Sequence, residues 1–210
     1  MKLKFLVLFL VFCTKIYSQE FIYDTFLQYK SSFSGNIDFY MVNSLKNVDL
    51  FTGYNINRKD FEIHGFIFEE KNQTYHKFKI FNLEKSISFV YQKSEKKENS
   101  DNKNLPKYYF KQIETLIDST RTKVLILGYK SPKMKRVQRS IEIIYENSDI
   151  KFNEQFLNSF SHGAFFNTDF KMSIGIPIKI ITDYKNGNVD TFERITKKTI
   201  TTKLIIPKTK

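Results

Sequence analysis

The chain has 210 residues and one cysteine, and its formal charge at pH 7 is +12. Aromatic residues make up 16% of it, which excludes a chain that is disordered throughout, and its length suits one domain or two small ones. Lysine supplies 29 of the 34 basic residues. Because proteins that read bases rely on the planar fork of arginine, this balance argues against nucleic acid as the partner.

The N-terminal residues have the pattern of a secretory signal peptide. Lys2 and Lys4 precede an apolar run over 5–12, and Ser18 is a small residue at which a cut can follow. The run is much shorter than the roughly 20 residues that span a bilayer. Lipidation of Cys13 is the alternative, but the bulky Phe12 precedes it. We therefore expect residues 1–18 to be removed and residues 19–210 to form one domain in the periplasm or outside the cell, without cysteine chemistry.

Alternating apolar and polar residues predict strands along most of this domain. The run over 124–127 is apolar on both faces, which is typical of a central strand. The segment over 109–113 also allows a short helix. Asn186-Gly187 lies between two apolar runs and predicts a hairpin with a type I′ turn. The expected strands lie at 33–41, 48–56, 61–68, 78–80, 87–91, 109–113, 124–127, 137–145, 176–180, 189–195 and 200–206.

Two segments have helical spacing, and one segment reads as a loop. Ile22, Phe26 and Tyr29 share one helical face near the start of the domain. A second helix is expected over 153–162, with an asparagine at its N-cap and a glycine after its end. The polar run over 93–104 is expected to be an exposed loop. The predicted fold is therefore α+β and mainly antiparallel β: a curved sheet or open half-barrel with one or two short helices.

No motif in the sequence marks a catalytic, metal or cofactor site. His64, His76 and His162 have no metal-ligand spacing, and there is no nucleophile elbow or phosphate-binding glycine loop. We therefore expect no cofactor, no metal and no enzyme activity, with a hydrolase that uses an unrecognised Ser/His/Asp site as the alternative. One basic cluster could contact an anionic membrane surface; it comprises Lys130, Lys133, Lys135, Arg136 and Arg139.

Two stretches resemble the GLPGLI-type secreted proteins. Ile126, Gly128, Tyr129 and Lys130 match one strand end of that family, and Gly175, Pro177, Ile178 and Ile180 match a later strand, whereas Ser131 stands where relatives often have cysteine. The resemblance covers about thirty residues. It implies a fold like that of periplasmic lipoprotein carriers, in which a strongly curved antiparallel sheet holds acyl chains and helices pack in its mouth.

The function we expect is non-enzymatic binding of a lipid-like or other apolar ligand, or of an envelope protein. A structural interaction domain is a further alternative. The aromatic excess suggests a pocket on the concave face of the sheet, although the same residues could fill an ordinary core. The candidate lining residues are Phe39, Phe61, Phe156, Leu157 and Phe160.

Overall fold

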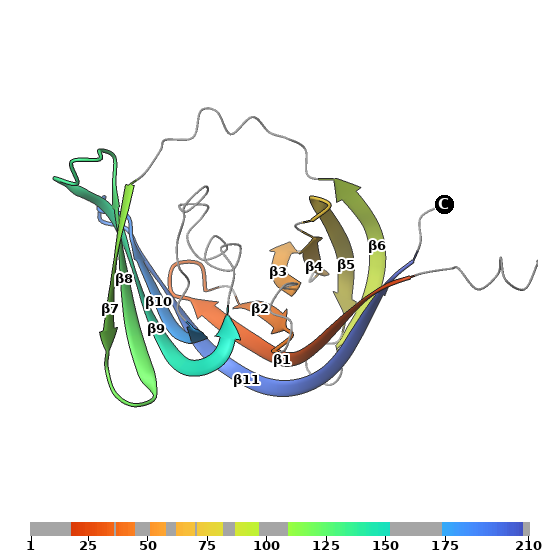
Figure 1. Ribbon diagram of the computed structural model, residues 1–210. Helices are drawn as coiled ribbons and strands as arrows, with labels where there is room; N and C mark the ends of the chain where they lie inside the picture. Colours follow the sequence, from red (N-terminus) through yellow and green to blue (C-terminus); the bar gives the residue numbers. More distant parts are fainter. Residues whose placement is uncertain are drawn as a thin grey trace, which may run out of the picture.

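The computed structural model describes residues 18–35, 37–44, 51–57, 62–69, 71–81, 87–96, 109–151 and 174–207. In these ranges the chain forms one antiparallel sheet of eleven strands, in the order β6-β5-β4-β3-β2-β1-β11-β10-β9-β8-β7. Figure 1 shows this sheet curved into an open trough, with β1 and β11 along its floor. The expected curved, mainly antiparallel sheet is confirmed.

Most strands pair with the strands that precede and follow them in the sequence. The long β11 pairs with both β1 and β10. The strands are β1 Gln19–Ser31, β2 Ile37–Val42, β3 Phe51–Asn57, β4 Glu62–Glu69, β5 Thr74–Phe81, β6 Ser88–Lys96, β7 Tyr109–Leu116, β8 Arg121–Tyr129, β9 Val137–Lys151, β10 Ile174–Asp183 and β11 Val189–Ile206.

The α+β prediction is wrong for the described residues, because they contain no helix. Ile22, Phe26 and Tyr29 lie in β1, which pairs with β2 on one side and with β11 on the other. Phe26 and Leu27 are both buried although they are consecutive. A strand that buries residues on both faces can therefore imitate helical spacing. The second expected helix, over 153–162, lies outside the described residues.

Several strand boundaries also differ from the prediction. Phe33 lies in a turn, not in β2, and is 74% exposed. The run over 124–127 belongs to β8, which is next to the edge strand β7 and is not central. The two expected C-terminal strands are one strand, β11, because β1 pairs with it across the polar interval, as in the pair Leu27 and Lys197. The first four residues of the expected loop over 93–104 belong to β6, which extends to Lys96; residues 97–104 lie outside the described ranges.

The buried residues form two clusters. The first, which we call the β8–β11 core, contains Leu27, Tyr29, Tyr40, Val42, Val124, Ile126, Ile141, Ile143, Tyr145, Ile150, Ile176, Ile180 and Phe192. The second, the β2–β5 core, contains Phe21, Tyr23, Phe26, Phe39, Met41, Phe51, Ile67, Phe78, Ile80, Leu204 and Ile206. Consecutive residues of β2 alternate between the two clusters. Because side chains alternate between the faces of a strand, the two cores lie on opposite faces of β2.

The β2–β5 core is built from aromatic rings that lie over glycines. The ring of Phe39 lies 5.5 Å from that of Phe26 and 5.9 Å from that of Phe51, measured between centroids. Phe39 pairs across the strands with Gly53, and a Cβ atom at Gly53 would lie 2.1 Å from Cζ of Phe39. Gly65 leaves the same kind of space for Phe51. Glycine in these strands therefore permits close ring packing, as glycine in a strand interior often does.

Three of the described turns lie at one end of the sheet. They join β1 to β2, β8 to β9, and β10 to β11. The antiparallel pairing of β9 with β10 places Ser140, just after the β8–β9 turn, opposite Asp183, just before the β10–β11 turn. The pairing of β1 with β11 places Ser31 opposite Phe192, beside the third. We call this the turn end of the sheet, and it carries the candidate site.

Candidate functional site

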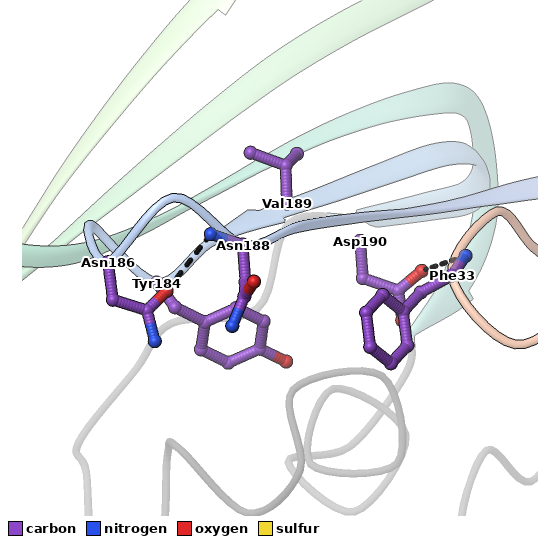
Figure 2. Close-up of a pocket in the computed structure, with 6 residues that line it drawn as sticks. All are labelled: Phe33, Tyr184, Asn186, Asn188, Val189 and Asp190. Atoms are coloured by element: carbon purple, nitrogen blue, oxygen red, sulfur yellow. Dashed lines mark hydrogen bonds between the residues drawn. The ribbon is translucent and has the colours of Figure 1, made fainter.

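A pocket of about 240 Å³ lies at the turn end, between the β1–β2 turn and the β10–β11 turn. Its surface is mostly apolar, and it is lined by Phe33, Tyr184, Asn186, Asn188, Val189 and Asp190. Figure 2 shows the rings of Phe33 and Tyr184 on the same side of the turns, whereas the side chain of Val189 points to the opposite side. The two rings therefore supply the main apolar walls. The volume is just below the roughly 300–1,000 Å³ of typical small-molecule sites.

Asp190 fixes the β1–β2 turn that carries Phe33. Its side chain is buried, and its Oδ1 accepts hydrogen bonds from Ser31 Oγ at 3.0 Å and from the backbone N–H of Phe33 at 3.2 Å. Ser32 adds two contacts with Thr191, one through its backbone N–H and one through its hydroxyl, which accepts the N–H of Thr191. A buried carboxylate requires such partners. This network therefore holds Phe33 at the rim although the ring itself is exposed.

The β10–β11 turn is formed by Tyr184 to Asn188. The backbone N–H of Tyr184 donates to the carbonyl of Asn188 at 3.1 Å, and the N–H of Asn188 donates to Oδ1 of Asn186 at 3.0 Å. Positive φ angles occur at Lys185 (57°) and Gly187 (93°) and not at Asn186. The hairpin at Asn186-Gly187 is therefore confirmed, but the type I′ turn is wrong, because that turn needs positive φ at both central residues.

Tyr184 of the pocket is affected by the charge of Arg139, which belongs to the basic cluster. Burial raises the pKa of Tyr184; the negative charge of Asp190 adds to this effect, and the positive charge of Arg139 opposes it. Arg139 precedes Ser140 on β9, and Ser140 pairs with Asp183 beside Tyr184. Arg139 therefore lies next to the β10–β11 turn.

The rest of the basic cluster lies in the neighbouring β8–β9 turn. Lys130, Lys133, Lys135 and Arg136 are exposed there, and Arg139 is half-buried. No described carboxylate is in an ion pair with any of these four exposed cations. The chain also has no acidic residue from 122 to 141. The cluster that the sequence singled out thus flanks a pocket that the sequence did not predict.

Of the expected lining residues, the structure describes Phe39, and Phe39 does not line this pocket. Phe39 is 2% exposed and packs in the β2–β5 core. Phe61, Phe156, Leu157 and Phe160 lie outside the described residues. The one sequence signal at the pocket was Asn186-Gly187. It predicted the β10–β11 turn but not the residues that form the walls of the pocket. Phe33, Tyr184 and Asp190 come together from distant parts of the chain, so no local pattern could have grouped them.

His76 has a serine and a carboxylate as partners. Its Nδ1 lies 2.7 Å from Oγ of Ser94 on β6, and its Nε2 lies 3.4 Å from Oε2 of Glu69. The hydroxyl of Tyr91 lies 2.7 Å from the same Oγ. These are the partners that the hydrolase alternative requires. The same contacts also satisfy a histidine that is 4% exposed, as buried polar groups generally require.

The other expected histidines do not join this network. His64 lies on β4 three residues from Ile67, which pairs with His76, so His64 faces the opposite side of the sheet. His162 lies outside the described residues. Within the described ranges, no cluster of three or more His, Cys, Asp or Glu side chains could hold a metal ion.

Comparison with known proteins identifies no family for this chain. No family model matches the sequence, and no curated protein matches it either. The described residues contain no helix long and apolar enough to cross a membrane.

Proposed function

We propose that this chain is an exported, non-enzymatic binding protein for a lipid-like or other apolar ligand, with an envelope protein as the alternative partner. The observation that carries the proposal is the apolar pocket at the turn end, walled by the rings of Phe33 and Tyr184. The signal-peptide pattern supports export. The GLPGLI-type resemblance remains a prediction, and it is in keeping with the curved open sheet.

The exposed ring of Phe33 supports a binding role. At 74% exposure it contributes little to the fold, yet the hydrogen bonds of Asp190 and Ser32 hold its turn in place. Covering an aromatic ring contributes about 1.5–3 kcal/mol when burial is complete. A ligand that covers part of the ring would therefore gain a useful share of its binding free energy there.

The test compares two exposed apolar side chains, one in the pocket and one away from it. Phe33→Ser removes an exposed wall of the pocket, whereas Leu116→Ser changes a side chain, 67% exposed, at the other end of the sheet, where it pairs with Thr122. Native mass spectrometry of the purified protein identifies co-purifying lipids, and calorimetry with a fatty acid measures affinity. We expect Phe33→Ser to weaken binding about tenfold, or ~1.4 kcal/mol, and Leu116→Ser to leave it unchanged. Absence of any lipid or fatty-acid binding would contradict the proposal.

A second candidate function is a serine hydrolase, and the contacts of His76 favour it. In that case Ser94 Oγ would attack the acyl carbon of an ester while His76 takes the hydroxyl proton at Nδ1, and Glu69 would stabilise the imidazolium. The bond from the acyl carbon to the ester oxygen then breaks, the imidazolium gives its proton to the departing alcohol, and water hydrolyses the acyl-enzyme. A fluorophosphonate probe distinguishes the two functions, because it labels activated serines. We expect no labelling that depends on Ser94 or His76; labelling that Ser94→Ala abolishes would establish the hydrolase instead.

A further inference from the structure

We propose that the ligand of the turn-end pocket is an amphiphile with an anionic head group, whose apolar end enters the pocket while its head lies against the β8–β9 turn. This inference rests on the proposed function and specifies its ligand. The topology brings the two features together, because Ser140, just after the β8–β9 turn, pairs with Asp183, just before the β10–β11 turn. Arg139 and Tyr184 are the next residues toward these two turns.

The acidic groups at the turn end already have cationic or hydrogen-bonding partners. Asp183 makes an ion pair with Lys185, and Lys185 also donates its backbone N–H to the same carboxylate. Asp190 accepts hydrogen bonds from Ser31 and from the backbone of Phe33. In contrast, the four exposed cations of the β8–β9 turn have no ion pair with a described residue. The available charge beside the pocket is therefore positive.

The charges also set the orientation of the ligand. Asp190 lines the pocket, so a carboxylate or phosphate pushed into it would meet a like charge at low exposure. An apolar end meets the rings of Phe33 and Tyr184 instead. The head group is then left at the rim, where the cations of the β8–β9 turn can approach it. Met134, 41% exposed in the same turn, offers further apolar contact.

The head group offers a second contact beside the pocket. Each buried methylene of the apolar end contributes about 0.8 kcal/mol, and association costs several kcal/mol in lost freedom. Exposed cations that attract an anionic head at low salt would add to the binding that burial of the apolar end provides.

The experiment compares dodecanoate with dodecanol, which have equal chains and differ in the charge of the head. Calorimetry at about 20 mM ionic strength, where the Debye length exceeds ~10 Å, measures both. The first variant neutralises Lys130, Lys133 and Lys135 together with glutamine. The matched control neutralises Lys71, Lys96 and Lys198, three exposed lysines away from the turn end, with the same loss of charge. Cosedimentation with anionic and with neutral vesicles tests membrane binding separately.

We expect dodecanoate to bind more tightly than dodecanol. The affinity of the turn variant for dodecanoate should fall at least about threefold, which is the effect of losing three exposed ion pairs of the weakest kind, whereas the control should keep its affinity. The dodecanol affinity of the turn variant should stay the same. Equal binding of both ligands, or equal effects of the two variants, would overturn the inference and leave the proposed function intact. Binding of neither ligand would overturn both. Binding to anionic vesicles without binding to dodecanoate would show that the cluster docks on membranes and would also overturn the inference.

Discussion

Replacing Gly53 with alanine tests whether strand glycines create the space for the aromatic rings of the β2–β5 core. A Cβ atom at Gly53 would lie 2.1, 2.2 and 2.7 Å from Cζ, Cε1 and Cε2 of Phe39, whereas carbon atoms in contact stay about 3.5–4.0 Å apart. The ring must therefore move by more than 1 Å in a core where Phe26 and Phe51 flank it. Overpacking of this kind costs about 1–3 kcal/mol.

The sign of the effect is diagnostic. Without a clash, alanine in a strand is about 0.5–1 kcal/mol more favourable than glycine, so an open site would be stabilised. We expect Gly53→Ala to lower the free energy of unfolding, measured by urea denaturation with far-UV circular dichroism. In the Phe39→Leu background the smaller side chain leaves room, so the same substitution should cost less. A stabilised Gly53→Ala protein, or equal costs in both backgrounds, would refute the packing argument.

Three further predictions concern polar and titratable groups. Asp190→Ala should lower the free energy of unfolding by about 1–3 kcal/mol, because the Ser31 hydroxyl and the Phe33 N–H lose their acceptor; Glu193→Ala, at an exposed position on the same strand, is the control for urea denaturation. Hydrogen bonds from Lys197 and Arg194 lower the pKa of Glu146. The contribution of Glu146 to folding stability is therefore present above the unfolded pKa of about 4.3 and is lost as the pH falls. Acid titration should destabilise the wild type more steeply than Glu146→Gln. Burial raises the pKa of Tyr29, so the contribution of this residue to folding stability is complete below the unfolded pKa of about 10 and is lost at higher pH. Tyr29→Phe lacks the hydrogen bond to the carbonyl of Pro177, but its stability should fall less steeply than that of the wild type in alkaline solution.

The sequence predicted the strands well because alternation is a local property. The strands of β8, β9 and β10 were placed from their own residues, and the β10–β11 hairpin from Asn186-Gly187. Helix and strand were confused in β1, because it buries consecutive residues, as Phe26 and Leu27 show. The length of β11 could not be read locally either. Its polar interval stays in the sheet because it pairs with β1, which lies near the other end of the sequence.

The candidate site was less predictable than the fold. Phe33 looked like the first residue of a strand, and only the hydrogen bonds from its turn to Asp190, 157 residues away, place it at a pocket rim. The basic cluster was visible because its residues are close in the sequence. Its neighbour Tyr184 was not, because the pairing of β9 with β10 brings the two turns together.

The location of the site follows from how β2 uses its two faces. Phe39 and Met41 point into one core, and Tyr40 and Val42 point into the other. With both faces of this strand covered, its apolar side chains are engaged in packing, and the ring-to-ring distances of 5.5 and 5.9 Å around Phe39 are those of filled aromatic clusters. A turn, where the chain direction reverses, can present a ring without covering it. Phe33 is such a ring, and the pairing of β9 with β10 places the basic turn beside the β10–β11 turn, so the same end of the sheet has both an apolar wall and a positive charge.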